Sequence, residues 1–461
     1  QNTAVGANAL DANTTANNNT AVGYASLGAN TTGTTNVAVG ALALDANTTG
    51  NENVAVGNNA LGANTTSGGN TAVGHEALDA QVDGGHDNTA IGFKTLSANT
   101  TGDDNVALGY EALLVNTDGD SNTALGFRAL LANTTADYNV AIGRFAMGAN
   151  TTGTRNVAIS PFALDANTTG NYNVAIGYGA LTTQTNDSNN TAIGYQSLHL
   201  NTQTNNTAVG YQALFANTNG GSNCAFGANA LDACTTADNN NAFGYIALGK
   251  STTGTKNNAF GKSAGQEVTT GSNNTLIGHD AGGNLSTGND NCFIGRSCGV
   301  AVTTGSSNIC IGRSAEVSDN SSTNRLVIGD NITLQINDTF AFGKSGNVVS
   351  NTFTSNATFT RNSDISLKKD VLTNEDCGLD FINDLRTVTF KWIDDRSHKE
   401  KMYGFIAQEV KAALDKHNIT DFNGWNETPD GIQGISYEMF VMPLVKAVQE
   451  LSEKVTALEA G

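Results

Sequence analysis

A short motif recurs along most of this chain at a nearly constant interval. Aligned on Asn-(Thr/Val)-Ala-(Val/Ile)-Gly, the motif glycine falls at Gly6, Gly23 and Gly40 and recurs as far as Gly329. The interval is 17 residues almost throughout, although Ser160 once replaces the glycine. The interval 74–92 is one residue longer and the interval 194–210 is one residue shorter. A fixed period this short predicts a solenoid in which each repeat stacks on its neighbours.

The repeat at residues 36–52 shows how one coil is expected to fold. Val-Ala-Val at 37–39 alternates and is β-branched, which favours a short strand. Gly40 is expected to end that strand in a conformation that a Cβ would hinder. Ala-Leu-Asp-Ala at 43–46 is predicted as a second short strand, and Asn-Thr-Thr-Gly at 47–50 as a turn. Parallel stacking at ~4.8 Å per coil would make a rod on the order of 90 Å long.

The core of such a coil is thin. Its expected members are the apolar residue before the glycine, the leucine four residues after it, and alanines, which is little for a monomer. Association side by side into a trimer would bury more of each coil. The pattern resembles the head repeats of trimeric autotransporter adhesins, left-handed parallel β-rolls with an Asn-Ser-Val-Ala-Ile-Gly signature and a shorter period. The resemblance covers roughly residues 2–330.

Several patterns inside the repeats have more than one interpretation. Asn-Thr-Thr matches a glycosylation acceptor, but its fixed place in each repeat favours the turn of each coil. The threonines suggest an ice-binding face, but they fall in predicted turns and not in Thr-x-Thr strands. Four aspartates in one register suggest calcium, but the glycine-rich nonapeptide of calcium β-rolls is missing: Asp11, Asp45, Asp79 and Asp165. We expect no metal and no cofactor.

Other residues vary between repeats. Cys224 and Cys292 stand where Thr or Val is usual and Cys310 where Ala is usual, so they are expected to replace small, half-buried residues. No carboxylate pair stands out from the repeats, which argues against a glycosidase site. Some aromatic residues that follow the glycine could contact sugars, although single surface aromatics need no explanation: Tyr110, Phe127, Tyr178, Tyr195 and Tyr211.

Composition limits the possible partners. Only 14% of residues are charged and the net charge is −19. No basic patch is present, which argues against nucleic acid, and an acidic surface disfavours anionic membranes. No apolar run approaches the roughly 20 residues of a membrane span. The chain begins at Gln1 inside a repeat, so we expect it to be a piece of a longer protein.

After Gly329 the 17-residue period fades, and three regions are predicted. Residues 1–330 form the β-solenoid rod, residues 331–362 an intertwined β neck, and residues 363–461 a small α+β domain with ordinary globular composition. The fold class is therefore mainly β, with a trimeric parallel β-roll or β-solenoid followed by the α+β domain.

The last region resembles the C-terminal intramolecular chaperone domain of endosialidases, phage tail spikes and tail fibres. Four strings in the family's order carry the resemblance over 363–461. Ser-Asp-Ile-Ser-Leu-Lys at 363–368 is similar to the family's Ser-Asp-x-Arg-Leu-Lys, and Leu379–Trp392 follows. The most diagnostic string is Tyr-Gly-Phe-Ile-Ala-Gln-Glu-Val at 403–410; Ile-Ser-Tyr at 435–437 precedes the closing helix. Its chaperone motif comprises Gly404, Phe405, Ile406, Ala407, Gln408 and Glu409.

The closing helix, at about 441–460, is predicted from spacing alone. Its apolar residues alternate intervals of three and four, which is the a/d seam of a coiled coil. Glu450 and Lys454 supply an i,i+4 pair. The alternative is an amphipathic helix packed on its own domain; the unbroken seam favours a parallel bundle, and the resemblance implies a homotrimer. The seam residues are Val441, Leu444, Val448, Leu451, Val455 and Leu458.

The resemblance implies self-cleavage at the bond between Asn362 and Ser363, because the family cleaves just before this serine. Ser363 would attack the preceding carbonyl by an N→O acyl shift or directly, and Lys368 would be the general base. Asp364 would orient Ser363 or hold the loop, while Gln408 and Glu409 pack or position. The alternative is a structural turn entering a lysine-capped helix. Ser366 stands where the family usually has Arg, and its presence could slow cleavage without abolishing assembly.

These patterns lead to one interpretation: a trimeric tail fibre of a phage or other virus, active in host attachment. Its C-terminal domain would register three chains, drive folding and then cut itself off as a single-turnover Ser/Lys peptidase. The expected partners are a host surface receptor, a glycan above all, and other virion tail proteins through a missing N-terminal part. The fibre would end in the virion and the released domain inside the host cell. Rival interpretations are a bacterial trimeric surface adhesin and a purely structural fibre with a retained, uncleaved chaperone.

Overall fold

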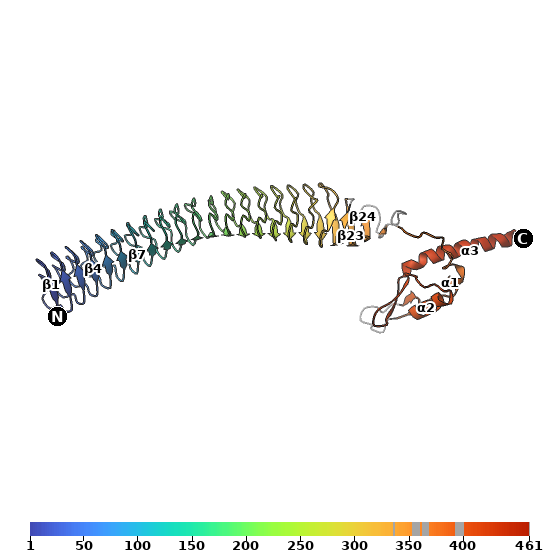
Figure 1. Ribbon diagram of the computed structural model, residues 1–461, viewed down its shortest axis with the longest axis horizontal. Helices are drawn as coiled ribbons and strands as arrows, with labels where there is room; N and C mark the ends of the chain where they lie inside the picture. Colours follow the sequence, from blue (N-terminus) through green and yellow to red (C-terminus); the bar gives the residue numbers. More distant parts are fainter. Residues whose placement is uncertain (335–336, 353–359, 362–367, 392–400, 461) are drawn as a thin grey trace. The chain divides into compact units, whose positions relative to one another are not determined.

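A computed structural model of the chain describes residues 1–334, 337–352, 360–361, 368–391 and 401–460. The chain divides into two compact units, Gln1–Asn362 and Ser363–Gly461, called here the solenoid unit and the C-terminal unit. The solenoid unit is a parallel β-solenoid with one short strand per 17-residue coil, and the C-terminal unit is a small α/β region that ends in a long helix (Figure 1). The fold is therefore mainly β, as the period predicts.

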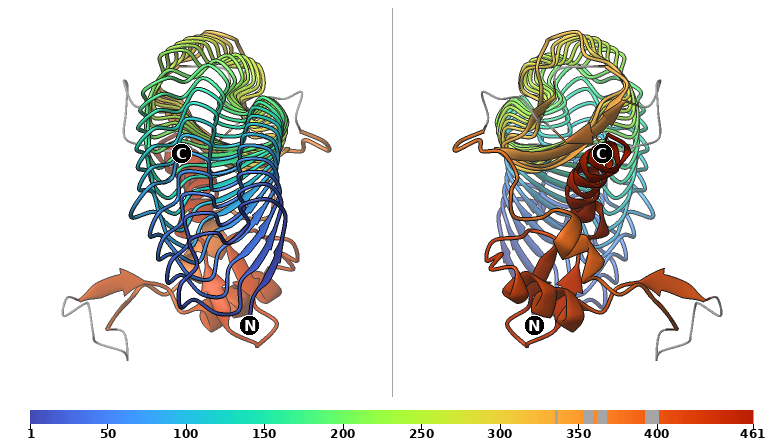
Figure 2. Two further views of the ribbon diagram at one scale, coloured as in Figure 1. Left: turned by 90° about the vertical axis from the view of Figure 1, so that its left-hand side faces the viewer. Right: turned by 90° about the vertical axis from the view of Figure 1, so that its right-hand side faces the viewer.

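Each coil contributes one strand to a single sheet, and the coils follow one another with a gradual offset (Figure 2). Nineteen strands of three residues each come first: β1 (Thr3–Val5), β2 (Thr20–Val22), β3 (Val37–Val39), β4 (Val54–Val56), β5 (Thr71–Val73), β6 (Thr89–Ile91), β7 (Val106–Leu108), β8 (Thr123–Leu125), β9 (Val140–Ile142), β10 (Val157–Ile159), β11 (Val174–Ile176), β12 (Thr191–Ile193), β13 (Thr207–Val209), β14 (Cys224–Phe226), β15 (Asn241–Phe243), β16 (Asn258–Phe260), β17 (Thr275–Ile277), β18 (Cys292–Ile294) and β19 (Ile309–Ile311).

Every one of these strands pairs in parallel with the equivalent residues of the next coil. Val37 lies opposite Val54, for example. The register survives both irregular intervals, because Thr71 still pairs with Thr89 and Thr191 with Thr207. The added or missing residue is therefore absorbed in the turns, which lie outside the ladder.

The three strand residues alternate between the inside and the outside of the coil. The middle residue, usually alanine, is buried, so the apolar residue before the glycine faces outward and is not part of the core of its own coil. That sequence expectation was wrong, because a three-residue strand with its middle residue inside must turn both flanking residues out. The outward third positions form what we call the outer apolar row: Val5, Val22, Val39, Val56, Val73, Ile91, Leu108, Leu125, Ile142, Ile159, Ile176, Ile193, Val209, Phe226, Phe243, Phe260, Ile277, Ile294, Ile311 and Ile328.

The predicted second strand at 43–46 is a run of turns instead. Leu42 and Leu44 both have left-handed backbone, with φ of 59° and 51°, which breaks the extended conformation that a strand needs. The backbone still bonds from coil to coil, since the Leu44 N–H donates to the Ala60 carbonyl at 3.0 Å. Leu44 is fully buried, so its predicted place in the core is confirmed.

The glycine that ends each strand is required by the spacing of the coils. Gly40 has φ of +137°, and a Cβ on it would lie 2.3 Å from the carbonyl oxygen of Gly57 in the next coil. Any side chain there would separate adjacent coils, so the predicted reason for this glycine is confirmed.

Two ladders of asparagine run through the interior, and the sequence interpretation missed both. The first is the motif asparagine: the Asn122 side-chain oxygen accepts from the Asn139 backbone N–H at 3.0 Å, and its amide donates to the Ala136 carbonyl at 2.8 Å. The second is the asparagine of Asn-Thr-Thr, where Asn133 donates to Asn116 at 2.8 Å. These side chains are buried. Asn-Thr-Thr is thus part of the turn, and its asparagine is inaccessible as a glycosylation acceptor.

The solenoid ends in a change of pairing. β20 (Glu316–Val317) pairs with β22 (Thr333–Leu334), while β21 (Leu326–Asp330) and β23 (Thr339–Lys344) continue the main sheet in parallel. β24 (Asn347–Thr352) then pairs with β23 antiparallel, and β25 (Thr360–Arg361) pairs with β24 in the same way. The predicted β character of the neck is present; its intertwining with other chains stays a prediction.

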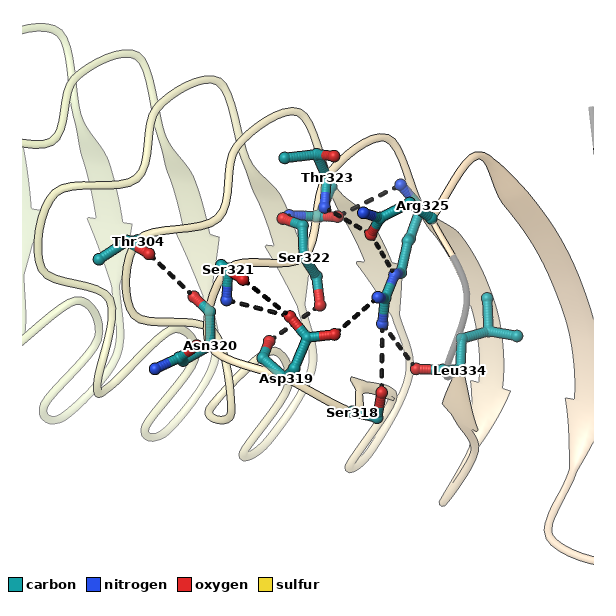
Figure 3. A network of polar contacts seen from close by, with 11 residues as sticks. Thr304, Ser318, Asp319, Asn320, Ser321, Ser322, Thr323, Arg325 and Leu334 are labelled. Atoms are coloured by element: carbon teal, nitrogen blue, oxygen red, sulfur yellow. Dashed lines mark hydrogen bonds and ion pairs between the residues drawn. The ribbon is translucent and has the colours of Figure 1, made fainter. Parts of the chain in front are cut away.

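A buried arginine stands where the first asparagine ladder ends (Figure 3). Arg325 stands where the next ladder asparagine would be, and its backbone N–H donates to the Asn308 side-chain oxygen at 3.2 Å. Its guanidinium donates to Asp319 at 2.8 Å, to the Leu334 carbonyl at 2.8 Å and to Asn337 at 3.0 Å. The Arg325 side chain is only 2% exposed. Arg325 therefore provides hydrogen-bond donors to polar groups at the end of the ladder that a further coil would otherwise bond.

The C-terminal unit contains α1 (Leu379–Asn383), α2 (Ala407–Lys416), η2 (Tyr437–Phe440) and α3 (Val441–Glu459), with two hairpins, β26 (Val388–Phe390) with β27 (Met402–Gly404) and β28 (Trp425–Glu427) with β29 (Gln433–Ile435). Its core gathers Phe381 of α1, Val410 and Leu414 of α2, and Phe440. No helix that the structure describes has both the length and the apolarity for crossing a bilayer.

Candidate functional site

The chaperone motif occupies the passage from β27 into α2. Gly404 closes β27 against the Tyr437 hydroxyl, which would lie 2.2 Å from a Cβ at position 404. The Phe405 N–H donates to that hydroxyl at 3.1 Å, and the Phe405 ring lies 5.8 Å from Tyr437 and 5.2 Å from Phe440, centroid to centroid. The motif is thus held to the segment before α3, which explains the need for glycine and an aromatic residue here.

The first turn of α2 is fixed by an ion pair. The Arg386 Nε donates to Glu409 Oε2 at 3.0 Å, and a second bond joins Arg386 Nη2 to Glu409 Oε1. The guanidinium lowers the pKa of the Glu409 carboxyl below its ordinary value through these hydrogen bonds. Gln408 is exposed and Ala407 half-buried. The positioning role expected for Glu409 stays a prediction.

A second ionic cluster joins the ends of α1 and α2. Asp384, which follows α1, accepts from Lys416 Nζ at 2.7 and 2.8 Å and lies 2.6 Å from His417 Nε2. These contacts lower the pKa of Asp384, with the Lys416 hydrogen bond as the largest cause. Sequence reasoning did not single out this cluster, because its members are 32 residues apart and carry no motif.

A cavity of about 510 Å³ opens beside the chaperone motif. It lies between the first hairpin, the motif and β29, and its lining includes Phe390, Met402, Phe405, Ile406, Ile435 and Tyr437. The lining is mainly apolar, and Met402, Ile406 and Tyr437 are exposed in the single chain. Three of the four strings that carry the family resemblance therefore converge on one place, although they are distant along the chain.

The predicted catalytic and cleavage residues are only in part described. Asn362, Ser363 and Asp364 lie outside the described residues, so the geometry between Ser363 and Lys368 is not on view. Lys368 itself is described and is exposed in the single chain. The nucleophile, the base and the scissile bond therefore stay predictions.

The closing helix uses two different faces. Pro443 and Ala447 are buried, and Glu450 accepts from the Leu379 N–H at 2.7 Å, so one face packs on α1 of its own unit. Glu450 forms its ion pair with Lys446 on the preceding turn, at 3.5 Å. The Leu379 N–H lowers the pKa of Glu450 most, and the expected partner Lys454 contributes a weaker Coulombic attraction that also lowers it. The a/d seam residues are all exposed, from 44% at Val455 to 81% at Leu458. Packing on its own domain therefore leaves the seam uncovered.

The cysteines match their predicted structural role. All six are free, and Cys224, Cys292 and Cys310 occupy strand positions inside the repeat. Burial raises the pKa of the Cys234 thiol to about 12, which keeps it protonated and unreactive. In the part of the chain that the structure describes, no group of three His, Cys, Asp or Glu residues converges as metal ligands.

Comparison with known families supports the reading of the C-terminal unit. Residues 363–419 match the model of a peptidase family described as chaperone of endosialidase. The match starts at Ser363 and includes the chaperone motif, α1 and α2, while Tyr437 and α3 follow it. No curated protein and no solved structure matches the chain. The chain thus carries an endosialidase-type chaperone domain, a self-cleaving peptidase class, behind a β-solenoid of 17-residue repeats.

Proposed function

We propose that the chain is the trimeric shaft of a viral tail fibre, assembled by its C-terminal unit and then released from it by self-cleavage. The observation that carries this proposal is the exposed a/d seam of α3 in a unit that matches a chaperone family. Six apolar side chains on one helix face have no partner in the described single chain, and a parallel coiled coil would cover them.

The solenoid offers a second surface for the same assembly. The outer apolar row is present in every coil from β1 to β21, so its spacing along the axis is one coil. Another copy of this chain has the same spacing and can match the row over its whole length. A partner without that period would match only a few coils. The homotrimer would therefore begin at α3 and extend along the rod.

The proposed cleavage uses only this chain and water. The Ser363 hydroxyl attacks the Asn362 carbonyl carbon while the Lys368 amine takes its proton. The C–N bond then breaks, the nitrogen of Ser363 takes the proton back from Lys368, and the acyl group of Asn362 is left as an ester on the Ser363 oxygen. Water then hydrolyses the ester, which gives a carboxylate at Asn362 and a free N-terminus at Ser363. The scheme requires the neighbouring chains of the trimer to bury Lys368, which is exposed in the single chain.

Such coupling would give the fibre its order of events. Long-range parallel β pairing is slow and its open edges aggregate, so registration at α3 would precede stacking of the coils. Cleavage after trimerisation would then leave a kinetically stable rod. Attachment to a host surface receptor, a glycan above all, is the role proposed for the rod; its other virion contacts would lie outside this chain.

Intact mass of the full chain tests the cleavage. The wild-type chain is expected to give two fragments split between Asn362 and Ser363, while Ser363→Ala and Lys368→Ala stay whole. Lys369→Ala, at the neighbouring exposed lysine, is the matched control and should cleave. A wild-type chain that is trimeric but uncleaved would reject the peptidase assignment and favour a retained chaperone. Ser366, in place of the family's usual Arg, would then be the sequence difference that indicates loss of cleavage.

Light scattering on a size-exclusion column tests the assembly. The chain with Ser363→Ala is expected to be a trimer, and adding Leu444→Glu with Leu451→Glu should make it monomeric or aggregated. Glu453→Lys, on the opposite side of the heptad, serves as the control. A monomeric Ser363→Ala chain at micromolar concentration would reject the trimeric fibre.

A further inference from the structure

Nine aromatic rings form a continuous ladder on the solenoid, one ring per coil, and no function described above uses it. Neighbouring ring centroids are 5.2 to 5.9 Å apart. Seven of the rings are exposed, among them Phe93 at 38% and Tyr211 at 51%, while Phe145 and Phe162 are half-buried. The members of this aromatic ladder are His75, Phe93, Tyr110, Phe127, Phe145, Phe162, Tyr178, Tyr195 and Tyr211. The sequence interpretation treated five of these as separate surface residues, and the stacking shows them to be one feature.

The ladder differs from the outer apolar row in its extent. The apolar row runs through every coil, as an assembly surface must. The ladder occupies only the coils from His75 to Tyr211. The same position carries Ala41 and Asn58 before it and Ala228 after it, so Tyr24 and Tyr245, at this position further out, stand apart from the ladder. Assembly of the whole rod therefore does not require the ladder. A feature confined to one stretch indicates a local task.

Charged residues border the ladder and keep it a solvent-facing surface. Glu76 pairs with Lys94 at 3.1 Å and Glu111 with Arg128 at 2.7 Å, each pair linking successive coils beside the rings. The Lys94 ammonium lies 5.7 Å from the Phe93 centroid and the Arg128 guanidinium 5.2 Å from the Phe127 centroid. This charged border distinguishes the ladder from the outer apolar row. It suits a polar ligand that also has apolar faces.

The ladder changes geometry at its middle. Phe145 and Phe162 stand one residue later in the repeat than the other rings, and the ring planes turn by 78° at each end of this pair. Arg144 takes the vacated ladder position and lies 5.3 to 5.9 Å from the centroids of Phe127, Phe145 and Phe162. Arg144 is exposed, and among the described residues no carboxylate lies within ion-pair distance of it. At the centre of the ladder the Arg144 guanidinium thus lies over aromatic rings, and its N–H groups are available to bind an anion.

We infer that the aromatic ladder binds a linear glycan laid along the solenoid axis, with a carboxylate-bearing sugar on Arg144. Sugar rings present both C–H groups and hydroxyls, which match ring edges and tyrosine hydroxyls arranged at a regular spacing. Arg144 can hold a sugar carboxylate in bidentate fashion. The chain's net charge of −19 repels a densely charged polyanion, so the ligand class is a glycan whose acidic sugars alternate with neutral ones.

This inference specifies the ligand for the attachment role proposed for the rod, and it rests on that proposed function. Its test does not depend on trimerisation or on cleavage. An array of linear oligosaccharides, neutral and uronate- or sialate-containing, is probed with the full chain carrying Ser363→Ala. The strongest binder is then titrated by calorimetry beside its carboxyl-reduced form. Mixed acidic and neutral glycans are expected to bind, with at least tenfold loss on reduction of the carboxyl or in 0.5 M salt.

Variants inside and outside the ladder complete the test. Arg144→Gln, and Tyr178→Ala with Tyr195→Ala, should each weaken binding at least tenfold. The controls occupy the same repeat position elsewhere, Arg296→Gln and Tyr24→Ala with Tyr245→Ala, and should bind like the parent chain. Circular dichroism and light scattering verify folding and assembly of each variant. Absence of binding to every glycan on the array, or equal losses from ladder and control variants, would overturn the inference. A change of oligomeric state with the ladder variants would overturn it too, because a second chain would then cover the rings.

Discussion

The ring of Phe293 fills the space that a side chain on Gly299 would need. A Cβ at Gly299 would lie 2.5 Å from the Phe293 ring, and both residues belong to the same coil. In earlier coils the corresponding residues are Ala38 and Leu44, both buried. The large residue has therefore moved from the fourth position after the motif glycine to the middle of the strand. Gly282 and Leu276 repeat this exchange in the preceding coil, where the Cβ would lie 2.7 Å from Leu276.

The exchange predicts a rescue. Phe293→Ala alone should destabilise the solenoid by about 3–5 kcal/mol through the cavity it leaves. Adding Gly299→Leu should restore much of that loss, since leucine adopts left-handed backbone at this position in other coils, as Leu44 does with φ of 51°. Gly299→Leu without the first change should destabilise by overpacking. Calorimetric midpoints of the three variants check this, and additive losses in the double variant would contradict it.

The asparagine ladder predicts a local loss of protection. Asn122→Ala removes the acceptor for the Asn139 N–H and one of two donors to the Ala136 carbonyl, which keeps its bond from the Asn133 side chain. The buried Asn139 N–H is then left without a partner. The expected cost is on the order of 3 kcal/mol. Hydrogen exchange should show the largest increase at the amide of Asn139. Asn58→Ala, which removes an exposed asparagine, is the control, and equal exchange in both variants would count against a role for the ladder.

The network around Arg325 predicts where the solenoid frays. Arg325→Met should remove one of two donors from the Leu334 carbonyl, which keeps the Ser318 N–H, and one of two from the Asn337 side chain, which keeps the Thr323 N–H. The expected cost is about 1–2 kcal/mol, with Asp319 partly compensated by solvent because it is half exposed. Arg325→Lys should lose less, since one ammonium can replace some of these bonds. Faster exchange confined to residues 309–334 is expected. Uniform loss along the solenoid would show that the network does not act as an end cap.

The two units are predicted to respond to acid with opposite signs. In the solenoid, burial raises the pKa of Asp45, Asp165 and Glu316. Their folded state binds protons more readily than the unfolded state, so stability increases as the pH falls from neutral through these raised values towards the ordinary value of about 4. The solenoid should therefore melt at a higher temperature at pH 4.5 than at pH 7.

In the C-terminal unit the corresponding shifts are downward. The backbone N–H of Leu379 lowers the pKa of Glu450, and Arg386 lowers that of Glu409. The stabilisation they give is complete above the ordinary carboxyl value and is lost as the pH falls below about 4. Both tryptophans of the chain lie in 363–461, so their fluorescence follows this unit while calorimetry follows the whole chain. Parallel shifts of both transitions between pH 7 and 3 would refute the prediction.

The sequence predicted the period, the strand and the glycine well, because each depends on contacts that repeat with the coil. Val37–Val39 and Gly40 recur in identical surroundings, so one repeat can be interpreted from twenty. The inside and outside of the strand were harder to predict. With three residues, Val39 is apolar whether it faces the coil interior or another chain, and only the burial of Ala38 decides between them.

The asparagines were misread for a related reason. Asn47 was assigned to a turn because asparagine is common in turns, and Asn53 was treated only as the first residue of the repeat motif. The buried Asn53 side chain accepts from the Asn70 N–H and donates to the Ser67 carbonyl, both in the next coil. The buried Asn47 side chain donates to the Asn30 side chain of the preceding coil. A fixed place in every repeat was the available signal, since a merely permissive turn position would vary. The aromatic ladder was likewise visible only once residues 17 apart were placed in contact.

Because each coil touches only the coil before and the coil after it, the number of coils is free to change. Removal of one whole repeat, such as 106–122, would bring together two surfaces that already fit one another and shorten the solenoid by about 4.8 Å. Duplication would lengthen it by the same step. Unequal recombination in the gene can therefore change the length of the solenoid in steps of one coil. The strand register, the end cap at Arg325 and the C-terminal unit stay as they are.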